Sequence, residues 1–265
     1  MLALFTVYAF ILGLIIGSFL NVCIYRIPKE ESIVKPPSHC MSCGQRLKAV
    51  DLIPVFSYIF LGGKCRHCKA KISPRYMLVE LLTGIVFAVL LLKFRNPVEF
   101  VAAAFLMSVL IIVFFIDWDH KIIPNGLVIA GLIGSAGLVV YNVFFKVSIF
   151  GQTKWWSHLL GLLPGTGFFL LIFIMAVIIY KNDDGFGMGD VKIFAPIGIF
   201  LGWKLCFVAL FLSIVSGGVI SMILLAFKIK GRKDAIPFGP YIVIGTFITI
   251  LYGTELLNLY LYHHL

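Results

Sequence analysis

Long runs of apolar side chains, separated by short polar stretches, dominate this chain from end to end. A helix needs about 20 apolar residues to cross a bilayer, and within lipid the backbone forms its hydrogen bonds inside such a helix. The pattern therefore predicts an all-α polytopic membrane protein with about eight transmembrane helices. The predicted spans are 2–25, 76–93, 98–116, 124–145, 158–180, 190–202, 204–227 and 238–260. In the alternative count, the short run 190–202 is a loop-like segment that does not cross.

Composition and charge support this class of protein. Of the 265 residues, 61% are hydrophobic and 13% are charged, with a mean hydropathy of +1.05, whereas soluble domains carry about 25% charged residues. Most of the 22 lysines and arginines lie in loops that share one side of the membrane if the N-terminus lies outside. Because short cytoplasmic loops accumulate basic residues, both termini are expected outside. The net charge of +10 fits contact with anionic membrane lipid, and no nucleic-acid-binding module is visible.

Two pairs of glycines at four-residue spacing fall inside predicted spans, Gly13 with Gly17 and Gly161 with Gly165. Small residues at this spacing allow neighbouring membrane helices to approach closely. Glycine is also common in membrane helices in general. The spacing alone therefore leaves open whether these glycines pack against a partner helix.

The polar segment 26–75 contains Cys40-x-x-Cys43 and Cys65-x-x-Cys68. Two such pairs can present four thiolates tetrahedrally, which suits zinc, and disulfides are disfavoured in a reducing cytoplasm. A segment this small buries little core, so a bound metal would supply folding energy. With four sulfur ligands no position stays open for water, so we expect structural zinc. His39 and His67 are the alternative ligands.

These observations predict three parts of the chain. The first transmembrane helix is expected at 1–25, the small zinc-binding cytoplasmic insertion at 26–75, and a transmembrane bundle that carries the chemistry at 76–265. The remaining cysteines, Cys23 and Cys206, lie in apolar runs and are expected to be packed thiols.

Two aspartates stand at the ends of apolar runs, where a carboxylate is costly and marks function by default. Asp117 ends one run, and Asp190 follows Gly187-Met188-Gly189 at the start of another. The predicted topology brings both to the same side of the membrane. Two nearby aspartates divide one proton between them, so one acts as acid and the other as base on a water molecule. Glycines beside Asp190 allow positive φ and close approach of a peptide backbone.

This pair of carboxylates suits an intramembrane aspartyl protease, and two other classes stay open at this point. In a proton-coupled membrane transporter, Asp117 and Asp190 would form a relay. In a scaffold protein, the cysteine segment would recruit partners and the carboxylates would be dispensable. Asp119 is interpreted as a solvated or supporting group.

The chain resembles the type IV prepilin peptidase family, also called leader peptidase and N-methyltransferase, a family of GxGD intramembrane aspartyl proteases. The similarity rests on Gly17-Ser18-Phe19-Leu20-Asn21-Val22, Tyr25-Arg26-Ile27-Pro28, the two CxxC pairs, Gly62-Gly63-Lys64-Cys65, Arg75-Tyr76 with Val79-Glu80-Leu81, Ile116-Asp117-Trp118-Asp119-His120 with Ile123-Pro124, Gly187-Met188-Gly189-Asp190-Val191-Lys192, and Ile236-Pro237-Phe238-Gly239-Pro240-Tyr241. These motifs occur in order along essentially the whole chain.

The resemblance implies a multi-pass enzyme of the bacterial inner membrane whose active site faces the cytoplasm. It would cleave the basic leader from type IV prepilins or pseudopilins after a glycine, for pili or type II secretion, with Asp117 and Asp190 as the catalytic pair. Cys40, Cys43, Cys65 and Cys68 would bind zinc. Many members also methylate the new N-terminus with S-adenosylmethionine. No residues for that cofactor follow from the sequence, although the Gly62-Gly63 turn and Glu80 are the region we would consider.

Overall fold

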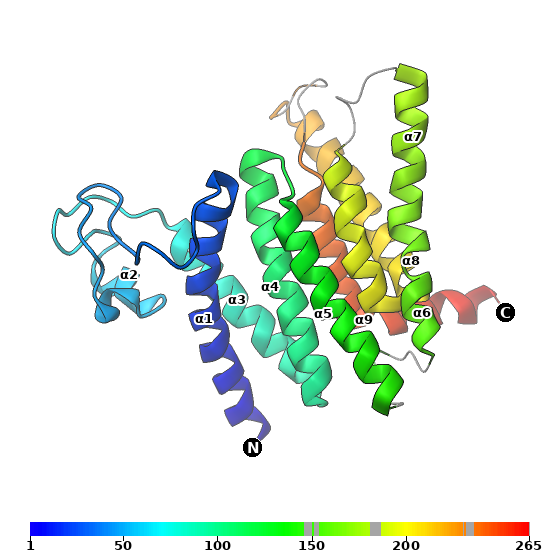
Figure 1. Ribbon diagram of the computed structural model, residues 1–265, viewed down its shortest axis with the longest axis horizontal. Coiled ribbons are helices and arrows are strands. Elements are labelled where there is room, and N and C mark those ends of the chain that lie inside the picture. The colour runs from blue at the N-terminus through cyan, green and yellow to red at the C-terminus, as the bar shows by residue number, and fades with distance from the viewer. Residues whose placement is uncertain (146–149, 151–153, 181–186, 230, 232–235, 265) are drawn as a thin grey trace. The chain divides into compact units, whose positions relative to one another are not determined.

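The computed structural model (Figure 1) describes residues 1–145, 150, 154–180, 187–229, 231 and 236–264. Its helices are α1 (Leu2–Arg26), α2 (Phe56–Phe60), α3 (Arg75–Lys93), α4 (Pro97–His120), α5 (Asn125–Phe145), α6 (Trp155–Leu160), α7 (Phe168–Tyr180), α8 (Met188–Ala226) and α9 (Gly239–His264), with the shorter helical turns η1 (Ile27–Lys29), η2 (Ala49–Leu52) and η3 (Leu163–Gly167). No β-sheet forms within these residues, where extended backbone pairs only in isolated bridges. The predicted all-α class is confirmed.

Among the described residues, seven helical segments are long and apolar enough to cross a membrane. They are Leu2–Lys29, Arg75–Lys93, Pro97–His120, Asn125–Phe145, Trp155–Ile179, Met188–Ala226 and Gly239–Leu261. The predicted multi-pass character is confirmed, and the count differs from the predicted one at a single place. The predicted spans 190–202 and 204–227 both belong to α8.

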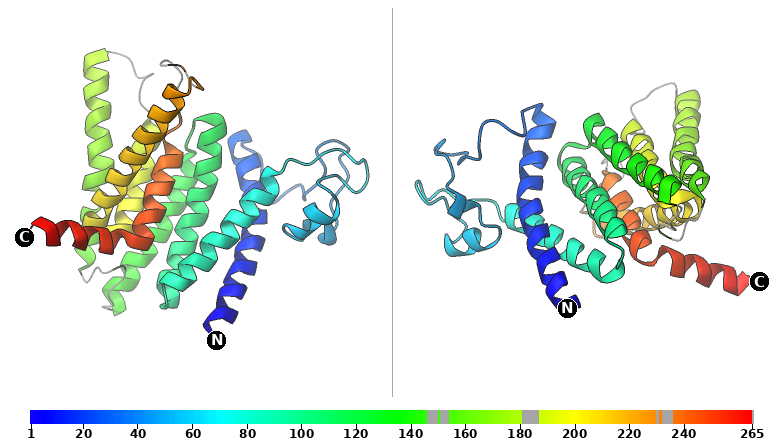
Figure 2. Two further views of the ribbon diagram at one scale, coloured as in Figure 1. Left: turned by 180° about the vertical axis from the view of Figure 1, so that it is seen from behind. Right: turned by 60° about the horizontal axis from the view of Figure 1, so that its bottom comes forward.

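The two arms of α8 run in opposite directions, because the chain leaves the helical conformation at Gly202 (φ 75°, ψ 166°). Asp190, in the first arm, interacts electrostatically with Asp117. Gly217, in the second arm, lies against the Phe238 ring. The next residue, Gly239, begins α9 and donates a hydrogen bond to Asp117. A straight helix would hold residues 190 and 217 about 40 Å apart at 1.5 Å per residue. Both can lie near Asp117 only if α8 folds back, and Figures 1 and 2 show the yellow and gold arms side by side.

The chain forms two compact units, Met1–Ala104 and Phe105–Leu265. In the first unit, α1 packs along α3. A Cβ atom on Gly13 would lie 2.7 Å from Gly84 Cα, and one on Gly17 would lie 2.8 Å from Glu80 Cα, so neither position has space for a side chain. The sequence left open whether Gly13 and Gly17 pack against a partner helix, and the structure shows that both lie against α3.

The second unit contains the other predicted glycine pair. Gly161, at the end of α6, lies against the backbone carbonyl of Gly198 in α8, and Gly165 lies against the ring of Phe194 in α8. These contacts leave no space for a Cβ atom, so Gly161 and Gly165 both serve close packing, a role that the sequence left open. The division of the chain into 1–25, 26–75 and 76–265 stays a prediction, although α1, the cysteine segment and α3 share one compact unit.

Replacing Gly202 by alanine should destabilise the second unit by about 1–3 kcal/mol, because the combination of φ and ψ at this position is accessible essentially to glycine alone. Gly218→Ala is the matched control in the same helix, since a Cβ there meets no atom within 4 Å. Thermal unfolding of both variants in detergent measures the difference. Equal unfolding temperatures for the two variants would contradict a fold-back held at Gly202.

Candidate functional site

Asp117 lies one turn before the end of α4 and is only 5% exposed. The helix ends where Lys121 adopts a left-handed conformation (φ 56°) and donates its backbone N–H to the carbonyl of Asp117 at 2.9 Å. Such a left-handed residue is a common helix terminus. Asp117 is therefore buried near the end of α4, just before the turn that leads to Pro124 and α5.

Gly239 holds the Asp117 carboxylate in place. Its backbone N–H donates to Asp117 Oδ2 at 2.8 Å, and a Cβ on Gly239 would lie 2.6 Å from the same oxygen. Gly239 is the first residue of α9, and the preceding Phe238 ring packs against Phe169 of α7, with 5.6 Å between ring centroids. Reasoning from residue chemistry missed Gly239. The glycine between Phe238 and Pro240 was a visible signal, but its partner 122 positions away was not.

Asp190 enters the site from the first turn of α8. Gly189 brings this turn close to the segment after α4, because a Cβ on Gly189 would lie 3.0 Å from Ile123 Cβ. Gly187 is exposed and has ordinary extended angles (φ −71°, ψ 109°). The expectation that these glycines provide positive φ is therefore wrong. What position 189 requires is space against Ile123.

The structure places the two predicted carboxylates within electrostatic range of each other. Asp190 is half-buried, and the negative charge of Asp117 acts on it electrostatically. Asp119 is exposed at the end of α4. Lys192 donates from Nζ to Asn125 Oδ1 at 3.1 Å, so its hydrogen bond reaches the start of α5. Two adjoining carboxylates, one of them partly accessible, are the groups needed for general acid and base catalysis on water.

The four cysteines of the first unit form one cluster. Their Sγ atoms all lie within 4.8 Å of one another, and Cys40 Sγ is 3.8 Å from Cys68 Sγ. A tetrahedral zinc site with Zn–S bonds of about 2.3 Å requires sulfur atoms about 3.8 Å apart. The four-sulfur donor set therefore fits a metal ion. His39 lies outside the cluster, where its Nδ1 pairs with the carbonyl of Pro37 at 3.0 Å.

Both cysteine pairs sit in equivalent backbone turns. In the first, Gly44 N donates to Cys40 O at 2.8 Å, and Gly44 has φ 69°. In the second, Lys69 N donates to Cys65 O at 3.1 Å, and Lys69 has φ 60°. Backbone N–H groups of Ser42 and Cys43 donate to the Cys40 sulfur and lower the pKa of its thiol to about 6. The turns thus favour the thiolate form at Cys40 that metal binding requires.

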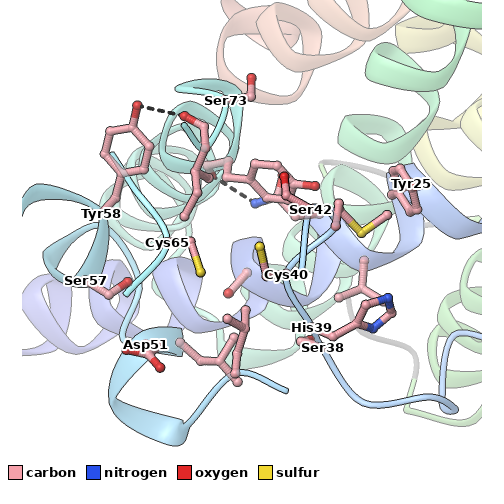
Figure 3. Close-up of a pocket in the computed structure, with 18 of the residues that line it drawn as sticks. Tyr25, Ser38, His39, Cys40, Ser42, Asp51, Ser57, Tyr58, Cys65 and Ser73 are labelled. Carbon is pink, nitrogen blue, oxygen red and sulfur yellow. Dashed lines mark hydrogen bonds between the residues drawn. The ribbon is translucent and has the colours of Figure 1, made fainter. Parts of the chain in front are cut away.

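A cavity of about 680 Å³ adjoins this cluster within the first unit (Figure 3). Cys40 and Cys65 form part of its wall, and Figure 3 shows both side chains there, with sulfur atoms that lie within 4.8 Å of one another. Residues of α1 and α3 complete the lining, among them Glu80, which is only 8% exposed. The region considered for a cofactor from the sequence therefore does contain a cavity, and Glu80 lines it.

The fold and these sites define a multi-pass membrane protein with a candidate carboxylate pair and a four-cysteine metal cluster. A model of the Bacterial Peptidase A24 N-terminal domain matches residues 11–94, and a model of the Type IV leader peptidase family matches residues 104–222. The first match contains the cysteine cluster and the cavity residues, and the second contains both aspartates.

Similar proteins carry the same description. The prepilin leader peptidase/N-methyltransferase of Bacillus subtilis is 34% identical over 254 residues, which is 95% of this chain and 96% of that protein. The one of Pseudomonas aeruginosa PAO1 is 30% identical over 288 residues, 97% of this chain and 93% of that protein. The one of Myxococcus xanthus DK1622 is 37% identical over 224 residues, and the alignment spans 84% of this chain and 64% of that protein. No solved structure matches the chain.

The chain belongs to the type IV prepilin leader peptidase/N-methyltransferase family, whose members are A24 aspartic peptidases. The resemblance read from its motifs is thereby confirmed. Membership makes it a multi-pass membrane enzyme of a bacterial family, and it implies prepilin substrates. The roles of individual residues are separate questions, which the geometry above helps to answer.

Replacing Cys65 by serine should reduce bound metal from about one ion per chain toward none, because the lost thiolate is one of four ligands in a site worth roughly 10–16 kcal/mol in comparable peptides. Cys206→Ala is the matched control, since Cys206 is a buried cysteine of the second unit. Elemental analysis of both purified variants gives the ratio of metal to protein. An unchanged ratio in Cys65→Ser places the ligands elsewhere.

Proposed function

We propose that this chain is an intramembrane aspartyl endopeptidase that removes the leader peptide of type IV prepilins or pseudopilins, with Asp117 and Asp190 as its catalytic pair. One observation carries the proposal: two carboxylates, one from α4 and one from α8, lie close enough to interact electrostatically, and Asp117 accepts a hydrogen bond from the N-terminus of α9. Family membership supports the activity. By the same resemblance, cleavage follows a glycine.

The hydrogen-bond pattern suggests how the two carboxylates divide the work. Asp117 accepts the Gly239 N–H at the positive end of the α9 dipole, an environment that favours a negative charge. Asp117 then acts as the base that removes a proton from water as the water oxygen attacks the scissile carbonyl carbon. Asp190, more accessible at the start of α8, donates its proton to the departing amine. The peptide C–N bond breaks, and no acyl-enzyme forms.

The proposed site faces the cytoplasm. Lys121 follows Asp117 closely, and Lys192 follows Asp190, so basic residues flank both carboxylates. Short loops with lysine and arginine are retained on the cytoplasmic side of the membrane. Under this assignment the cysteine segment, with its many basic residues, is cytoplasmic as well, and the reducing compartment keeps its thiols available for zinc. The zinc is structural, because all four ligand positions are sulfur.

The second activity proposed is methylation of the new N-terminal residue, with S-adenosylmethionine as methyl donor. The names of the relatives include N-methyltransferase. Cleavage must come first, because methylation requires the amine that cleavage releases. The proton-coupled transporter that the carboxylates alone left open would move a solute and leave prepilin length unchanged. Expressing the chain with a prepilin and measuring the mass of the product distinguishes the two, since cleavage shortens the product and methylation adds one methyl group.

Asp117→Asn and Asp190→Asn should each lower prepilin cleavage by at least about 10³-fold, because an amide keeps the size of the side chain but cannot exchange the proton. The control is Asp119→Asn, which changes an exposed carboxylate two positions from Asp117 and should leave cleavage close to wild type. Cleavage is followed by the mass of the pilin product at equal enzyme concentration. Near-normal cleavage by either variant of the pair would remove that residue from the mechanism.

Gly239→Ala should lower cleavage by about 100-fold, since a Cβ atom 2.6 Å from Asp117 Oδ2 must displace the carboxylate and a shift of about 1 Å costs that much. Gly137→Ala in α5 is the control, because a Cβ there meets no atom within 4 Å. Both variants are assayed for kcat and for bound metal. If Gly239→Ala cleaves like Gly137→Ala, the contact between Gly239 and Asp117 has no part in catalysis.

A further inference from the structure

Residues 50–60 form an apolar stretch within the otherwise polar segment between α1 and α3. The stretch contains η2 and α2, which pack against each other. Soluble proteins rarely leave large apolar side chains gathered on their surface, and such patches mark contact with a protein or a membrane. The exposed apolar side chains of this stretch, called the apolar patch below, are Val50, Leu52, Ile53, Phe56, Ile59 and Phe60.

The short helix α2 presents opposite faces to the cavity and to the outside. Tyr58 lines the cavity, as Figure 3 shows, and its hydroxyl donates to the Ile72 carbonyl at 3.3 Å. Phe56, Ile59 and Phe60 have the i, i+3, i+4 spacing that places side chains on one helix face, and Phe60 is 85% exposed. Because the polar side of α2 is tied to the cavity wall, its apolar side faces away from the unit.

A hydrogen bond fixes the level of α2 along the membrane-spanning helices of the first unit. Val55, the residue before α2, donates its N–H to Glu80 Oε2 at 2.7 Å, and Ser18 hydrogen-bonds the same carboxylate. At a rise of about 1.5 Å per residue, Glu80 lies about 8 Å from the first residue of α3, and Ser18 lies about 12 Å from the last residue of α1. Figures 1 and 2 likewise show α2 beside α1 and not beyond its C-terminal end.

The partner available at this level is lipid. The polar region of a bilayer is about 5–7 Å thick on each side, since the hydrocarbon core takes about 30 Å of a total of about 40–45 Å. The level of Val55, about 8–12 Å from the helix ends, therefore corresponds to the boundary between headgroups and acyl chains. An apolar helix face that lies along a membrane is buried at this boundary. A soluble partner could reach the apolar patch only by displacing headgroups.

Basic side chains at both ends of the stretch suit anionic lipid. Lys48 precedes it and Lys64 follows it, and both residues are exposed. Asp51 is the single carboxylate in the sequence from 44 to 71, and it is already paired with Arg66. The surroundings of the apolar patch therefore carry a net positive charge, which attracts the anionic lipids of a cytoplasmic leaflet.

We propose that residues 50–60 are an interfacial anchor, seated in the bilayer leaflet on the same side as the cysteine segment. The exposed face of α2 lies among the upper parts of the acyl chains, and Lys48 and Lys64 contact the headgroups of anionic phospholipids. The anchor gives the cysteine segment an attachment to the membrane besides α1 and α3. This inference goes beyond the proposed peptidase, and its test does not use cleavage.

The test measures lipid contact at one position, with the full chain in vesicles of phosphatidylcholine and phosphatidylglycerol. Phe60→Trp adds a tryptophan at an exposed aromatic position, and its fluorescence is taken as the difference from wild type, which has four tryptophans. Phospholipids brominated near the top of their acyl chains quench a tryptophan that lies against them. The added tryptophan should lose about half or more of its fluorescence, because an interfacial helix face lies about 5–10 Å deep, at the level of these bromines.

Val34→Trp is the matched control, because Val34 is an apolar residue of the same unit that is 76% exposed and follows the end of α1 by eight positions. Its fluorescence should stay unchanged in brominated vesicles. A second measurement needs no variant: wild-type protein is irradiated in vesicles that contain a phospholipid with a photoactivatable carbene precursor close to the glycerol. Lipid adducts are expected in the peptide that contains Phe56–Phe60 and not in the peptide that contains Val34.

The possible outcomes are distinct. Weak and equal quenching of both variants, with no lipid adduct on α2, overturns the anchor and leaves the apolar patch to a protein partner or to the second unit. Strong and equal quenching overturns it too, since lipid would then contact the segment without preference for α2. If Phe60→Trp fails to accumulate, the adducts of the wild type decide.

A change of lipid tests the part assigned to the lysines. In vesicles of phosphatidylcholine alone, quenching at position 60 should weaken, because Lys48 and Lys64 lose their anionic partners. Equal quenching in both lipid mixtures removes the headgroup contact from the proposal. Cleavage of prepilin by the wild type is a separate assay, so a failure of the anchor and a failure of the peptidase are distinguishable.

Discussion

The hydrogen bond from Gly239 N–H to the Asp117 carboxylate joins elements that are far apart in the chain, and the candidate peptidase site depends on it. It places the N-terminus of α9 against the end of α4. The neighbouring Phe238 contacts Gly217 in the second arm of α8, while Asp190 approaches from the first arm. This contact needs glycine, because a Cβ atom at position 239 would lie 2.6 Å from Asp117 Oδ2.

In both units, glycines allow the backbones of neighbouring helices to approach closely. Lipid provides little hydrophobic driving force between helices, so packing depends on positions where small residues let backbones touch. Gly17 brings α1 onto Glu80 in the first unit, and Gly161 meets Gly198 in the second. In the first unit this contact lies at the buried carboxylate-bearing residue Glu80 itself. These glycines therefore matter because they allow another group to come close. Gly202 differs, because its backbone angles themselves favour glycine.

The two units carry different groups of reactive side chains. The proposed peptidase pair, Asp117 and Asp190, lies in the second unit, where two carboxylates would share protons around a water molecule. The first unit has a cavity of about 680 Å³ with Glu80 in its wall. Cys40 and Cys65 also line that cavity, so a metal held by the four cysteines would act through folding and shape.

The sequence by itself determined the helical membrane class and the cysteine cluster, and it pointed to Asp117 and Asp190 as the candidate pair, because apolar run length, CxxC spacing and the cost of a carboxylate in lipid are local properties. Only the tertiary structure decided what those residues meet. The reversal of α8 depends on the backbone angles of one residue, Gly202. The contact of Gly239 with Asp117 and the position of Glu80 beside Ser18 each join residues that are distant in the chain. Neither periodicity nor composition records such pairings, since they arise when helices pack.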